Sequence, residues 1–154
     1  DKRNRGNASL VCNLVSVKEI MKQHTKWMKR TLVVIHGFIA LSAAAGGYYI
    51  LSSGGIGMPL AWLASAPFHE YLIPGLILFF VVGGTNVIAC LLLIRNNKYA
   101  RESSAIGGFG QLIWIYTEIY LIHQSHWLQT LYFSLAVAIL ILIMLLLKYE
   151  RKTI

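Results

Sequence analysis

Charged side chains are scarce in this sequence. Only 13% of its 154 residues are charged and only six are acidic, whereas soluble domains average about a quarter charged residues. Hydrophobic residues make up 56% of the chain. These proportions exclude an intrinsically disordered chain and an ordinary soluble domain.

The motifs of common enzyme classes are also missing. Cys12 and Cys90 are the only cysteines and form no CxxC pair, so neither a disulfide framework nor a dithiol redox motif is present. There is no phosphate-binding glycine loop, no HExxH zinc motif and no recognisable nucleophile triad. The six acidic residues are too few for a phosphate-processing metal site. These absences argue against a free-standing enzyme and leave open whether the chain has a catalytic activity.

Four long hydrophobic runs fill most of the chain, at residues 31–53, 72–94, 105–123 and 127–147. About 20 helical residues cross a hydrocarbon layer of about 30 Å, and backbone in lipid must satisfy its hydrogen bonds internally. Each run therefore predicts a transmembrane helix. The predicted fold is an all-α, polytopic integral membrane protein, with a four-transmembrane-helix bundle as its one membrane domain at residues 31–147.

The basic residues indicate how this bundle is oriented. All fourteen Lys and Arg fall in the tail at residues 1–30, the loop between the second and third runs, and the tail at residues 148–154. The other two loops hold none. Because cytoplasmic loops carry an excess of Lys and Arg, we predict that both termini face the cytoplasm. The formal net charge of +8 then indicates a membrane surface and not nucleic acid as the partner.

The tail at residues 1–30 is predicted to be a basic amphipathic helix that runs into the first span. Its apolar residues recur at helical spacing among the lysines, at Leu10, Leu14, Val17, Met21 and Met28. Two interpretations stay open, an interfacial anchor on anionic lipid and a docking segment for a partner protein. Met21 and Met28 are also candidate natural starts, which leaves open whether the whole tail is native.

One acidic residue, Glu118, lies inside a predicted span. A carboxylate among lipid tails is costly, so such a residue is a functional hypothesis by default. Gln111, Trp114 and Glu118 follow one another at intervals of three and four residues, which places them on one face of the third helix. That face should look into the bundle. Glu118 is then either a proton or cation site or a hydrogen-bonding partner of a neighbouring helix.

Three polar residues lie at a similar depth from the basic ends of the first three spans. They are His36, Asn86 and Gln111, and we call them the inner polar layer. This layer either holds the helices together by hydrogen bonds or forms a ligand-binding or proton-relay pocket that opens toward Glu118.

The opposite end of the bundle gathers an outer-face cluster of His69, Glu70, His123 and His126. Neutral imidazole nitrogens suit zinc and copper, so His69, His123 and His126 are candidate metal ligands. The alternatives are plain interfacial histidines, pH sensing and contacts with a quinone head group. The cofactor stays open among none, a lipid and a quinone.

Three segments carry a resemblance to known proteins, namely PFHEYLIPGLILFFVVGG, RNNKYAR and WIYTEIYLI. They resemble small bacterial four-helix membrane proteins of uncharacterised function and, more distantly, the DoxX-like families, over roughly residues 66–135. DoxX-like proteins often carry an acid shortly before a paired glycine, where this chain has Val81 and Val82 before Gly83. The resemblance implies a bacterial cytoplasmic (inner) membrane location and an association with quinone or thiol redox chemistry. It assigns no catalytic residue.

These observations favour an accessory subunit or a bundle that binds a lipid or another small ligand. The first alternative is a homo-oligomeric small transporter or channel that uses Glu118. The second is a quinone- or metal-linked redox component of the membrane. The expected partners are membrane lipids, with anionic lipid at the N-terminal tail, and either a membrane partner subunit or further copies of the chain.

Overall fold

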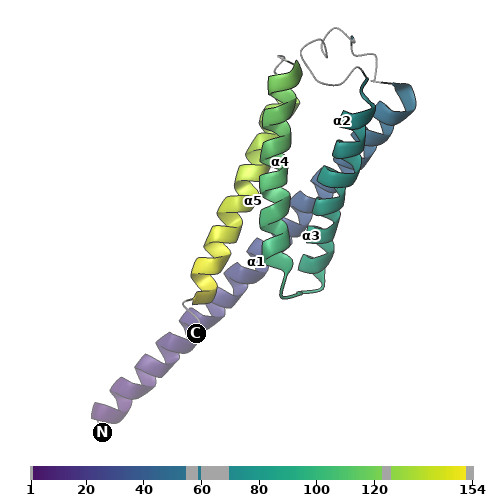
Figure 1. Ribbon diagram of the computed structural model, residues 1–154. Helices are drawn as coiled ribbons and strands as arrows, with labels where there is room; N and C mark the ends of the chain where they lie inside the picture. The colour runs from purple at the N-terminus through teal and green to yellow at the C-terminus, as the bar shows by residue number, and fades with distance from the viewer. Residues whose placement is uncertain (1, 55–58, 60–69, 123–125, 152–154) are drawn as a thin grey trace.

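The computed structural model describes residues 2–54, 59, 70–122 and 126–151, and every regular element in these ranges is a helix (Figure 1). The elements are α1 (Lys2–Ser53), α2 (Leu72–Leu76), the π-helix η2 (Ile77–Gly83), α3 (Gly84–Ile94), α4 (Ala100–Ile122) and α5 (Trp127–Arg151). Helical structure is unbroken from the start of α2 to the end of α3. These three elements therefore form one long helix with a wider turn in its middle.

The structure confirms an all-α membrane protein at a coarse level. Within the described residues, three helical stretches are long and apolar enough to cross a membrane, at Val15–Ser53, Leu72–Ile94 and Trp127–Tyr149. Helix α4 has 23 residues, which is long enough to cross a membrane, but it is not among these three described stretches. The fourth span stays a prediction.

The long helices pack side by side in a ring. Helix α1 contacts η2 and α3, α3 contacts α4, α4 contacts α5, and α5 contacts α1 (Figure 1). Most of the side chains buried inside the ring are apolar, and Leu32 and Ile39 from α1 and Ile139 and Leu146 from α5 are fully buried. Large apolar side chains such as Leu41 also cover the outside of the ring, as expected for a surface that faces lipid.

Helix α1 carries the N-terminal tail into the bundle without a break. It is 52 residues long, and its first part projects beyond the end of α5 (Figure 1). Val15, Val17 and Ile20 are each more than half exposed on this part. The tail thus continues the direction of the first span, and its contact with anionic lipid or with a partner protein stays a prediction.

One close approach holds α1 against η2. A Cβ atom on Gly47 would lie 2.7 Å from the Cβ of Phe79 and 3.0 Å from its backbone nitrogen and Cα. Real Cβ atoms do not approach other heavy atoms this closely. The two helices can therefore meet here only because residue 47 has no side chain.

Candidate functional site

A buried hydrogen bond joins α1 to α3 inside the ring. The Nδ1 atom of His36 and the Oδ1 atom of Asn86 are 2.7 Å apart, and both residues are fully buried. The amide nitrogen of Asn86 donates to the carbonyl oxygen of Val82 at 2.8 Å. The Val82 carbonyl oxygen only accepts hydrogen bonds, so the Asn86 amide nitrogen must face it. The other amide atom of Asn86, Oδ1, therefore faces the imidazole. The Nδ1 of His36 therefore donates, and a neutral ring carries its free lone pair on Nε2.

Helix α4 faces this pair with a glycine. A Cβ atom on Gly107 would lie 3.2 Å from Cε1 of His36 and 3.4 Å from Oδ1 of Asn86. Gln111 follows Gly107 by one helical turn and is 3% exposed. Ser104 precedes Gly107 by about one turn and is fully buried. The structure thus brings two members of the inner polar layer into contact and places the third one turn from a residue that touches both.

Three buried polar atoms in this region have no hydrogen-bond partner among the described residues. They are Nε2 of His36, Oγ of Ser104 and Oε1 of Gln111. A buried polar atom without a partner costs about 1–3 kcal/mol, and more where no water is near. The amide oxygen and the neutral imidazole nitrogen only accept, and the hydroxyl can accept or donate. The region is therefore suited to a hydrogen-bond donor, such as a hydroxyl group.

Glu118 lies further along α4 and has a different partner. Its carboxyl group interacts with the side chain of Gln129, which is buried on α5. The Oε1 atom of Gln129 accepts from the backbone N–H of His126 at 2.9 Å, so the amide nitrogen faces the carboxyl group. Seven residues, or about 10 Å of helix rise, separate Glu118 from Gln111. Trp114, between them, packs against the apolar core.

The outer-face cluster is only partly described. His69 and His123 lie outside the described residues, whereas Glu70 and His126 are described and exposed. The described part of the chain contains no group of three His, Cys, Asp or Glu side chains that could hold a metal ion. A metal site at His69, His123 and His126 stays a prediction.

Sequence reasoning misses two buried polar residues of this region, Ser104 and Gln129. Ser104 precedes Gln111 by seven residues, a spacing that puts both on one helix face and could have identified it. Gln129 lies in the first turn of α5, and the sequence carries no signal that pairs it with Glu118. That pairing depends on how α4 and α5 are rotated against each other.

The helices and the buried polar groups together define a class, an all-α membrane protein with a polar layer inside its bundle. Comparison of the chain with protein-family models, curated proteins and solved structures finds no match. The DoxX-like resemblance therefore stays a prediction, and the function is argued from the site itself.

Proposed function

We propose that this chain is a membrane-embedded binding protein that holds a small amphipathic ligand by a hydroxyl group, alone or as the accessory subunit of a larger complex. One observation carries the proposal. The buried atoms Nε2 of His36 and Oε1 of Gln111, with the hydroxyl of Ser104 on the same helix as Gln111, have no partner among the described residues. A hydroxyl donor from a ligand would satisfy one of these acceptors, since Ser104 and Gln111 lie seven residues, or about 10 Å of helix rise, apart.

The chemistry of these atoms narrows the ligand. The carbonyl oxygens of a quinone only accept hydrogen bonds, so they would face acceptors on a neutral His36. A quinol or a lipid with a free hydroxyl offers the donor that the site lacks. The apolar helices around the layer suit the rest of such a molecule. The location proposed with this function is the bacterial cytoplasmic membrane, with α4 as a fourth span and both termini in the cytoplasm.

A native mass spectrum of the detergent-purified protein, recorded with its ultraviolet and visible absorption spectrum, tests this proposal. We expect one bound hydroxyl-bearing molecule per chain, and the absorption spectrum would identify a quinol, a haem or a coloured metal. Gln111→Leu should lose the bound molecule because it removes an acceptor at nearly constant volume. Thr117→Val on the same helix is the control, since the Thr117 hydroxyl donates to the Ile113 carbonyl at 2.8 Å. A wild-type protein without any bound molecule would contradict the proposal.

A second candidate is a homo-oligomeric proton or cation transporter that uses Glu118. It is favoured by the partner of this acid, because the uncharged amide of Gln129 leaves the carboxyl group free to gain or lose a proton. Proton-coupled flux into liposomes should be lower by about tenfold or more for Glu118→Gln than for wild type. Glu102→Gln, in the exposed first turn of the same helix, is the control. Equal flux for Glu118→Gln and wild type would remove Glu118 from the mechanism.

A further inference from the structure

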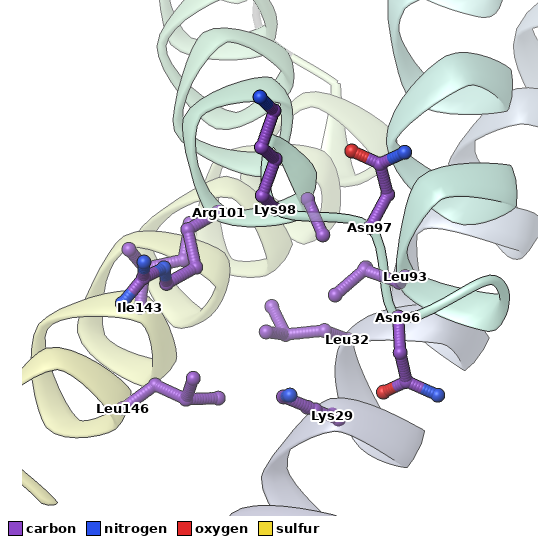
Figure 2. A pocket seen from close by; sticks show the side chains of 10 residues that line it. Lys29, Leu32, Leu93, Asn96, Asn97, Lys98, Arg101, Ile143 and Leu146 are labelled. Atoms are coloured by element: carbon purple, nitrogen blue, oxygen red, sulfur yellow. The ribbon is translucent and has the colours of Figure 1, made fainter. Parts of the chain in front are cut away.

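A pocket of about 170 Å³ lies where α1, the turn between α3 and α4, and α5 meet (Figure 2). Three basic residues line it, Lys29 from α1 and Lys98 and Arg101 from the turn and the start of α4. Its remaining wall is largely apolar, with side chains from three helices. These are Leu32, Leu93, Ile143 and Leu146.

The pocket lies at a boundary between apolar and polar parts of the molecule. Leu32, Leu93 and Ile143 belong to the hydrophobic runs at residues 31–53, 72–94 and 127–147, whereas Lys29 and Lys98 lie outside them. Lys29 lies one helical turn before Leu32, and Lys98 lies in the turn after α3. In a bilayer this places the apolar wall at the edge of the hydrocarbon and the cations at the level of the lipid phosphates.

The charged side chains among the described residues that line the pocket are all basic. No acidic side chain is among the described residues that line it, and the amides of Asn96 and Asn97 add neutral polar groups. Helix α4 begins here, at Ala100, and the start of a helix carries a partial positive charge. The Lys98 ammonium lies 4.8 Å above the centre of the Tyr99 ring, and in Figure 2 its side chain extends away from the apolar wall, but its flexible stem can turn toward a bound anion.

The size and the walls of the pocket favour one kind of anion. A drug-sized molecule needs about 300–1,000 Å³, so this pocket holds only a small group such as a phosphate with part of a glycerol. A free inorganic phosphate would gain nothing from the apolar wall. We propose that this pocket binds the phosphate of an anionic phospholipid, whose acyl chains lie along the apolar outside of the helices. The site rests on the membrane location proposed above and is independent of the inner polar layer.

A matched pair of double variants tests this proposal. Lys29→Gln/Lys98→Gln removes two charges from the pocket and leaves Arg101, whereas Lys26→Gln/Arg95→Gln removes two exposed charges from the same two segments outside it. Native mass spectrometry in detergent measures binding of phosphatidylglycerol and of phosphatidylcholine to each protein. Wild type should bind one phosphatidylglycerol at least tenfold more tightly than phosphatidylcholine, by order of magnitude. The pocket variant should bind it about 30-fold more weakly, and the control should stay within about twofold of wild type.

Two results would overturn the proposal. An equal loss of phosphatidylglycerol binding in both double variants would show that only the overall surface charge attracts the lipid. Inorganic phosphate that binds as tightly as phosphatidylglycerol, and with the same dependence on Lys29 and Lys98, would make the occupant a water-soluble anion. Lys29→Arg/Lys98→Arg keeps both charges and should bind like wild type, which separates charge from folding. Flotation of the protein with liposomes checks the membrane location separately, so that failure of the lipid site and failure of the proposed location are distinguishable.

Discussion

His36 is fully buried in a helix that lipid would surround, and its ring nitrogens have different environments. Nδ1 has Asn86 as a partner, whereas Nε2 has none among the described residues. The hydrogen bond to Asn86 therefore orients the ring and fixes its neutral tautomer. The lone pair on Nε2 is then available to accept a proton or a hydrogen bond from a ligand. This division is typical of histidines that bind a ligand or pass a proton.

The His36–Asn86 hydrogen bond predicts an energetic coupling between the two residues. Asn86→Leu alone leaves the Nδ1–H of His36 without an acceptor, so we expect a loss of about 1–3 kcal/mol in the free energy of unfolding. His36→Phe/Asn86→Leu removes both polar groups and should cost less than the sum of the single changes. Reversible unfolding in mixed micelles measures this cycle. The coupling should be about 0.6 kcal/mol and no more than about 1.7 kcal/mol, the range found for hydrogen bonds inside membranes. Strictly additive single changes would show that the hydrogen bond contributes nothing.

The depth of these residues could be predicted from the sequence, but their partners could not. Each helical residue adds about 1.5 Å, so counting from the basic ends places His36, Asn86 and Gln111 in one layer. Which side chains then touch depends on how each helix is rotated about its axis, and packing against the other helices decides that. Gly107 illustrates the point, because its importance comes from the His36 and Asn86 atoms beside it.

At the scale of elements, hydropathy locates the helices better than it locates their ends. The second run matches the helical stretch Leu72–Ile94 at both ends. In contrast, α4 begins at Ala100 and α5 continues to Arg151, whereas the predicted runs begin at 105 and end at 147. Helical hydrogen bonding continues into polar sequence outside the hydrocarbon, where an apolar run has already ended. The π-helix η2 also escapes prediction, because one wider turn hardly alters the hydrophobic pattern of a stretch that is apolar all round.

The space around two glycines predicts different effects of their substitution by alanine. Gly47 lies in the contact between α1 and η2, and Gly84 begins α3. Gly47→Ala would put a Cβ atom 2.7 Å from Phe79 and 3.0 Å from its backbone, so the helices must move apart. We expect a loss of about 1–3 kcal/mol in stability, typical of overpacking. Gly84→Ala has no neighbour within 4 Å of the added Cβ atom and should be neutral or gain up to about 1 kcal/mol from its helix propensity. Thermal unfolding in detergent measures both. Equal melting temperatures for the two variants would contradict the close packing at residue 47.

At the scale of the whole molecule, segments that are far apart in the sequence meet at one end. Lys29 from α1 and Lys98 and Arg101 from the start of α4 line one pocket, and the ring centroids of His24 and Tyr149 lie 6.2 Å apart between α1 and α5. The three basic segments of the sequence thus gather at the same end of the bundle, beside the turn between α3 and α4 (Figure 1). This arrangement is what a Lys- and Arg-rich cytoplasmic face requires.

Cysteine labelling tests how this bundle crosses the membrane and whether α4 is a transmembrane span. Three single-cysteine proteins are needed, Ser52→Cys, Asn97→Cys and His126→Cys, each with Cys12 and Cys90 replaced by Ser. All three positions are exposed at the ends of the long helices. If the basic end is cytoplasmic, a membrane-impermeant maleimide should label Ser52→Cys and His126→Cys in right-side-out vesicles, and Asn97→Cys only in inverted ones. Asn97 and His126 flank α4, so labelling of both from the same side would show that α4 does not cross. In the structure, α1 ends beside the start of α2, at the far end of the bundle from the turn between α3 and α4 (Figure 1). Ser52→Cys and Asn97→Cys should therefore be labelled from opposite sides of the membrane. Labelling of these two from the same side, with His126→Cys labelled from the other, would contradict this arrangement of the helices.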